Sequence, residues 1–80
     1  MSNLDKYNLI FGEVFSISEN LINDQFTNES AENWDSIRHL SLITAIEDSF
    51  DIMLDTEDIL GFTSYLIGKH ILMEKYKINF

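Results

Sequence analysis

The 80-residue sequence contains no cysteine, no proline and only three glycines. Without cysteine the chain cannot form disulfides or thiolate metal sites, and any thiol chemistry would need a group from outside the polypeptide. The scarcity of proline and glycine, together with 45 % hydrophobic residues, favours a folded helical domain over a disordered chain. A chain of this length predicts one small domain over residues 1–80.

Basic residues are also scarce, since 5 stand against 14 acidic residues and the formal net charge is −9. Such a charge repels nucleic-acid phosphates and anionic membrane surfaces, and it favours protein partners with basic docking patches. No apolar run approaches the roughly 20 residues that a membrane-spanning helix needs. The apolar stretch 9–15 is interrupted by Gly12 and Glu13 and lacks the basic flank of a secretory signal. We expect a monomeric cytoplasmic protein with no membrane span and no nucleic-acid partner.

Apolar residues recur at helical spacing in three segments, which predicts helices over about 3–16, 36–50 and 64–77. A shorter helix from Thr56 to Leu60 is expected to stop at Gly61 in the left-handed conformation. A long polar connection, 17–35, separates the first two helices, and we expect its apolar residues to pack on the core. The prediction is an all-α four-helix bundle with three longer helices, a short third helix and a long loop between helices 1 and 2. The residues expected to pack are Leu4, Tyr7, Phe11, Val14, Phe15, Ile17, Leu21, Ile22, Phe26, Trp34, Leu42, Ile43, Ile46, Phe50, Met53, Phe62, Leu66, Ile67, Ile71, Leu72 and Met73.

Asp35 and Ser36 mark the start of the second predicted helix. Both residue types are favoured as helix N-caps, so the simplest interpretation is that one of them caps this helix. At about 100° per residue, Ile37 and Leu40 fall away from the core face and share the opposite face with carboxylates. An apolar centre with a charged rim is typical of a protein docking surface. Further acidic residues follow the serine: Glu47, Asp48, Asp51, Asp55, Glu57 and Asp58.

The two histidines do not indicate catalysis. The helical angle of His39 places it near the core face, which favours a hydrogen-bonded and partly buried side chain, and His70 is interpreted as a helix-face residue. No serine has a histidine at a spacing that indicates a nucleophile and its base. A calcium loop is also excluded, because no register starting at Asp48 or Asp51 has glycine sixth and glutamate twelfth.

Residues 33–60 resemble the core of acyl carrier proteins and of the related peptidyl carrier proteins. The similarity runs through Trp34-Asp35-Ser36-Ile37, the segment 45–50 with its E-x-x-F ending, and the acidic segment Glu57-Asp58-Ile59. Leu40 and Leu42, which lie between the first two of these segments, also match the family pattern. The predicted helix lengths and the long first loop agree with that family over almost the whole chain.

The resemblance implies that Ser36 is the attachment site for 4′-phosphopantetheine, delivered from coenzyme A by a phosphopantetheinyl transferase that uses magnesium. Asp35 would assist recognition by that transferase. The carrier itself would be no enzyme, with no catalytic residue and no metal of its own. A loading ligase and downstream enzymes of fatty-acid, polyketide or related biosynthesis would be its other partners. The docking residues implied are Ile37, Arg38, Leu40, Ser41, Glu47 and Asp48.

Three positions depart from the carriers of general fatty-acid synthesis. Arg38 and Ser41 stand where those carriers usually have acidic residues, and a tryptophan before the aspartate, Trp34 here, is more usual in free-standing carriers of specialised pathways. The resemblance therefore implies a carrier for a dedicated pathway. Acyl and aminoacyl cargo both stay open, and an unmodified acidic interaction module is the alternative from another class.

Overall fold

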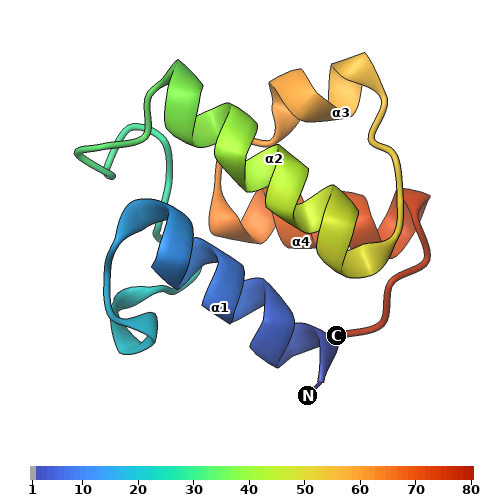
Figure 1. Ribbon diagram of the computed structural model, residues 1–80, viewed down its shortest axis with the longest axis horizontal. Coiled ribbons are helices and arrows are strands. Elements are labelled where there is room, and N and C mark those ends of the chain that lie inside the picture. The colour runs from blue at the N-terminus through green and yellow to red at the C-terminus, as the bar shows by residue number, and fades with distance from the viewer. Residues whose placement is uncertain (1) are drawn as a thin grey trace.

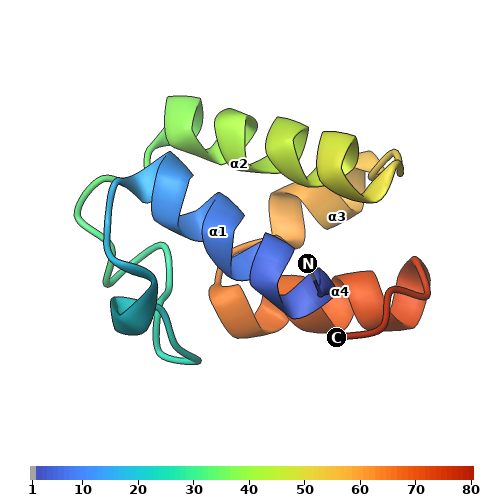
Figure 2. The same cartoon turned by 60° about the horizontal axis from the view of Figure 1, so that its bottom comes forward.

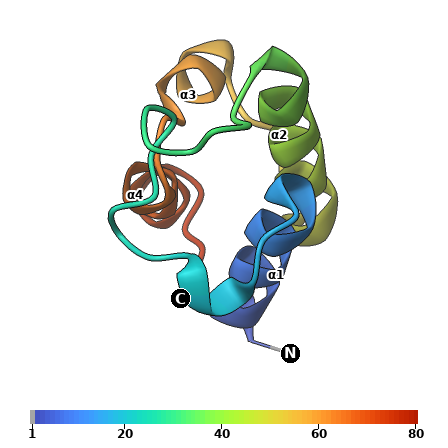
Figure 3. The same ribbon diagram turned by 90° about the vertical axis from the view of Figure 1, so that its left-hand side faces the viewer.

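The computed structural model describes residues 2–80, and within them the chain is all-α, as predicted, with four α-helices and no strand. Helices α1 and α2 lie side by side, and α3 and α4 form the other side of the molecule (Figure 1 and Figure 3). The predicted helix limits are confirmed to within two residues. The elements are α1 (Asn3–Phe15), a short 3-10 helix η1 (Glu19–Leu21), α2 (Ser36–Phe50), α3 (Thr56–Gly61) and α4 (Tyr65–Lys75).

Polar side chains fix where three of the helices begin. The hydroxyl of Ser2 accepts a hydrogen bond from the Asp5 amide at 3.1 Å, at the start of α1. The hydroxyl of Ser64 accepts one from the Ile67 amide at 2.9 Å, at the start of α4. Asp35 does the same for α2. Each bond satisfies an amide that has no partner inside its helix.

Left-handed residues end α1 and α2, at Ser16 and Asp51, each with φ of 55°. The prediction that Gly61 would end α3 in this conformation is wrong. Gly61 is the last helical residue of α3, and no glycine among residues 2–80 has a positive φ. The chain leaves the helix at Phe62 instead, which has φ of −80° and a fully buried side chain.

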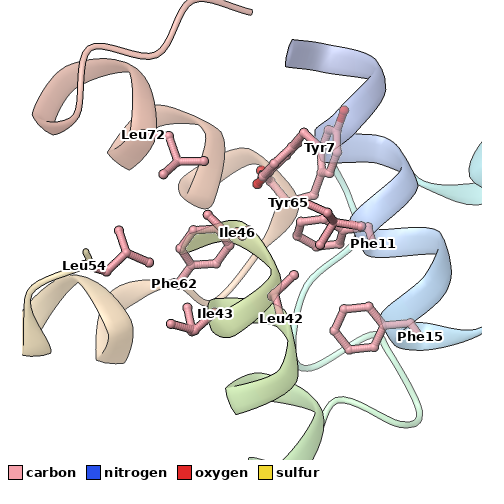
Figure 4. Close-up of a cluster of buried hydrophobic side chains, with 11 residues drawn as sticks. Tyr7, Phe11, Phe15, Leu42, Ile43, Ile46, Leu54, Phe62, Tyr65 and Leu72 are labelled. Carbon is pink, nitrogen blue, oxygen red and sulfur yellow. The ribbon is translucent and has the colours of Figure 1, made fainter. Parts of the chain in front are cut away.

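The core is a layer of large side chains between the two helix pairs (Figure 4). Three aromatic rings of α1 line one side of it, namely those of Tyr7, Phe11 and Phe15, and α2 contributes aliphatic residues. Burial of each such side chain contributes about 1.5–3 kcal/mol. The buried apolar residues are Tyr7, Ile10, Phe11, Phe15, Leu42, Ile43, Ile46, Leu54, Phe62, Tyr65 and Leu72.

The predicted packing face of α4 is partly wrong. Its buried residues are Tyr65, Gly68 and Leu72, whereas Ile67 is 46 % exposed. A Cβ atom at Gly68 would lie 2.3 Å from Cε1 of Phe62 and 2.6 Å from the Tyr7 hydroxyl. The missing side chain thus lets the backbone of α4 approach the aromatic rings, and this contact fixes the rotation of the helix. Other residues expected in the core are exposed: Leu4, Leu21, Met53 and Met73, while Leu66 is half-buried without joining the core cluster.

The long segment 16–35 covers one end of the helices (Figure 2). Its residues Ile17, Ile22, Phe26 and Trp34 pack against the core, as predicted. The segment is also bonded to the start of α4, because the Tyr65 amide donates to the Phe26 carbonyl at 2.9 Å.

The start of α1 and the last residues of the chain lie close together (Figure 1). The side-chain amide of Asn3 donates to the Asn79 carbonyl at 2.9 Å. Among residues 2–80, none of the helices combines the length and the apolar character needed to cross a membrane.

Candidate functional site

Ser36 is the first residue of α2, and its side chain is exposed. The cap of this helix is Asp35, whose Oδ1 accepts a hydrogen bond from the Arg38 amide at 2.8 Å. The capping role that the sequence left open between the two residues therefore belongs to the aspartate. The serine hydroxyl is presented at the N-terminus of a 15-residue helix without serving as its cap.

Two side chains beside Ser36 bind the end of α1. The amide of Asn33 donates to the Phe15 carbonyl at 3.0 Å, and Nη1 of Arg38 donates to the Val14 carbonyl at 2.8 Å. These carbonyls belong to the last turn of α1, where the helix itself supplies no donors. The start of α2 is thus fixed to the end of α1 on both sides of the serine.

Trp34 and His39 form a third attachment. The indole Nε1 donates to Nδ1 of His39 at 3.0 Å, and Nε2 of His39 lies 2.7 Å from the Ile59 carbonyl of α3. Because a carbonyl can only accept, Nε2 carries a proton. Because an indole N–H can only donate, Nδ1 carries none, and the imidazole is neutral. The prediction of a hydrogen-bonded, partly buried histidine is confirmed. Trp34 is also the loop anchor that the sequence indicated, since its ring packs against Phe15 at a centroid distance of 4.9 Å.

A groove runs past Ser36, between the first turns of α2 and the end of α3. Leu40, Ile59 and Leu60 supply apolar walls, and Asn28 and Thr63 supply polar groups. The remaining lining residues are Trp34, Asp35, Ser36 and His39.

Four of the six predicted docking residues share one exposed face of α2. Ile37 and Leu40 are 74 % and 61 % exposed, and they line a shallow surface with Ser41 and Asp48. Leu60 of α3, 73 % exposed, adds apolar surface on the other side of Ser36. Residue spacing does not predict the exposure of Leu60, because the orientation of so short a helix depends on its tertiary contacts.

The other two predicted docking residues have partners inside the protein. The guanidinium of Arg38 is bound to α1, as described above. Oε2 of Glu47 accepts from the Leu54 amide at 2.9 Å and so supports the connection to α3. Neither charged group joins the face formed by Ile37, Leu40, Ser41 and Asp48.

Asp58 is another acidic residue that the structure withdraws from the surface, with 3 % exposure. It accepts hydrogen bonds from Nζ of Lys75 at 2.7 Å and from the Tyr76 hydroxyl at 2.6 Å. These bonds, that of Lys75 first, hold the pKa of the Asp58 carboxyl below its usual value. The same contact raises the pKa of the Lys75 ammonium. Asp58 therefore joins α3 to the end of α4, and it does not contribute to an exposed acidic rim.

Within residues 2–80, no three acidic or histidine side chains are grouped closely enough to hold a metal ion. No protein-family model matches the chain, and the search of curated proteins gave no significant match.

Proposed function

We propose that this chain is a carrier protein of the acyl carrier type, forming a single carrier domain in which Ser36 receives 4′-phosphopantetheine. The observation that supports this most directly is the placement of Ser36. Its side chain is exposed on the first turn of α2, while Asp35, Asn33 and Arg38 hold the backbone on both sides of it. A transferase can thus approach an accessible hydroxyl in a pre-positioned segment.

The surroundings of Ser36 suit a phosphodiester. A helix N-terminus offers amides without intrahelical partners and the positive end of the helix dipole, both of which favour a bound phosphate. The prosthetic group would supply the thiol that a cysteine-free chain lacks, and its thioester would carry the cargo. The four helices and the long segment between α1 and α2 are compatible with the four-helix bundle of a carrier. Asp35 would hold the first turn of α2 in shape and take part in transferase recognition.

The exposed surface around Ser36 suits protein partners. Ile37, Leu40 and Leu60 would form the apolar centre of the contact, with Asp48 at its rim. The net charge of −9 favours partner enzymes with basic patches. These partners would be the transferase, a ligase that loads acyl or aminoacyl cargo, and the enzymes that act on the loaded carrier. A cytoplasmic, monomeric protein fits this function, because coenzyme A is the donor of the arm.

We also propose that the carrier serves a dedicated pathway, on the evidence of two of the three departures from the general fatty-acid carriers. Arg38 directs its charge toward α1, so its difference from the usual acidic residue has a structural explanation. Ser41 and Trp34 are the departures that still support a specialised set of partners.

Incubation with coenzyme A, Mg²⁺ and a broad-specificity transferase tests the proposal. We expect intact-mass analysis to show one added phosphopantetheine, and no addition in Ser36→Ala. Ser49→Ala, at the other end of the same helix and outside the docking face, is the matched control and should be modified like the wild type. If several transferases leave the folded protein unchanged in mass, an unmodified acidic interaction module becomes the better proposal. Modification that persists in Ser36→Ala would contradict the assignment of the serine.

A further inference from the structure

One turn after Ser36, the ring of His39 joins three segments of the chain. It belongs to α2, it accepts from the Trp34 indole at 3.0 Å, and it donates to the Ile59 carbonyl of α3 at 2.7 Å. The indole and imidazole rings also stack, with a centroid distance of 6.2 Å and an interplanar angle of 30°. All three residues line the groove beside Ser36. The shape of that groove therefore depends on one side chain.

Only the neutral imidazole satisfies both hydrogen bonds. A protonated ring would carry a hydrogen on Nδ1, which would then face the N–H of Trp34, and two donors cannot bond to each other. The bond from Nε2 to the Ile59 carbonyl would persist. Protonation would thus break the hydrogen bond from Trp34 and keep the hydrogen bond to α3.

The charged groups on the elements beside the ring have hydrogen-bond partners of their own. Asp35 lines the same groove, and its carboxylate accepts from the Arg38 amide. On α3, Glu57 and Asp58 face Lys75 of α4, at 3.3 and 2.7 Å. The guanidinium of Arg38 is directed toward the Val14 carbonyl.

We propose that His39 is a positioning residue for Ser36: its neutral ring holds Trp34 and the end of α3 against the first turns of α2, and protonation releases Trp34. The consequence for modification rests on the proposed function of Ser36. A partner that recognises this arrangement binds more weakly when only a fraction of the molecules adopts it, by the inverse of that fraction. Loss of His39 should therefore raise KM for the carrier and leave kcat unchanged.

The first experiment needs no coenzyme A, because Trp34 is the one tryptophan of the chain and its indole N–H signal and fluorescence are unambiguous. In the wild type we expect both signals to change when acid protonates the ring, because the indole N–H then loses its acceptor. His39→Asn keeps an acceptor near the position of Nδ1, and His39→Gln keeps a donor near that of Nε2. Neither the asparagine nor the glutamine side chain can be protonated, so both variants should lose the acid-induced change in the Trp34 signals. A wild type without it, or variants that retain it, would overturn the proposal.

The second experiment measures transferase kinetics on the intact chain at about pH 8. We expect KM to rise in His39→Ala by up to about tenfold for each of the two hydrogen bonds that the ring loses. His39→Asn and His39→Gln, which each keep one bond, should give smaller increases.

The matched control is Tyr7→Phe, which removes the buried bond from the Tyr7 hydroxyl to the Tyr65 carbonyl at 2.7 Å, outside the groove. It should lower stability without raising KM. An equal rise in KM in this control, or a fall in kcat in the His39 variants, would overturn the positioning role. If no form is modified at Ser36, the proposed function fails, while the tryptophan signals still decide whether His39 holds Trp34.

Discussion

Helix α3 is attached to its two neighbours in different ways. On the side of α2, a neutral imidazole donates to the Ile59 carbonyl at 2.7 Å. On the side of α4, the buried carboxylate of Asp58 accepts from a lysine ammonium at 2.7 Å and from a tyrosine hydroxyl at 2.6 Å. Charge-assisted hydrogen bonds are roughly twice as strong as neutral ones. The stronger attachment thus lies away from the groove, and the weaker one lies beside Ser36.

This difference gives α3 a fixed side and an adjustable side. Elements that border a binding site are drawn from the less stable parts of a structure, because they must accommodate what binds. The attachment to α4 can hold α3 in the fold while the attachment to α2 opens. Substitutions on the two sides should therefore have different signatures.

The largest expected effect is that of Asp58→Asn. The amide keeps the shape of the side chain and loses the charge, so the bonds from Lys75 and Tyr76 weaken. We expect the free energy of unfolding to fall by about 1.5–3 kcal/mol, the range for hydrogen bonds to charged groups, as measured by urea denaturation. Glu57→Gln is the control, because the Glu57 carboxylate also contacts Lys75 while the side chain is 79 % exposed. A loss in Glu57→Gln as large as in Asp58→Asn would mean that the burial of Asp58 is unimportant.

Acid should remove the same contribution from the wild type. Because the pKa of Asp58 is lowered in the folded protein, its carboxylate stabilises the fold above the unfolded pKa of about 4. That stabilisation is lost as the pH falls through the lower, folded pKa. The difference in unfolding free energy between wild type and Asp58→Asn should therefore be constant from about pH 5 to about pH 8 and shrink below about pH 4. Urea denaturation across this range measures it, and a difference that persists at the acid end would contradict the linkage.

Residue spacing predicted much of the serine side of the site. The start of α2 follows from the cap preferences of Asp35 and Ser36. The exposure of Ile37 and Leu40 and the partial burial of His39 follow from helical angles, which depend on one helix alone. The partners of Arg38 and Glu47 do not follow from such angles. Long side chains can reach a neighbouring element, and which atoms they meet depends on the tertiary fold.

The side of α4 was less predictable for a related reason. A count of aliphatic residues favours Leu66 and Ile67 as its packing face, whereas the structure buries Tyr65 and Gly68. Tyrosine is only partly apolar and glycine has no side chain, so neither residue marks a buried face in a hydrophobic pattern. Here their burial follows from the size of the aromatic rings on α1 and from the close approach that a missing side chain permits.

Alanine substitutions at Gly68 and Gly61 test the packing between α3 and α4, because they should have opposite effects on stability. A Cβ atom at Gly68 would lie 2.3 Å from the ring of Phe62, so overpacking of about 1–3 kcal/mol should exceed the gain in helix propensity of about 1 kcal/mol. At Gly61 a Cβ atom would meet nothing within 4 Å, and the backbone is not left-handed. We expect thermal denaturation to show a lower melting temperature for Gly68→Ala and a slightly higher one for Gly61→Ala. If Gly68→Ala were also stabilising, the Phe62 ring would have room to move, and the α3–α4 contact would be as adjustable as the contact at His39.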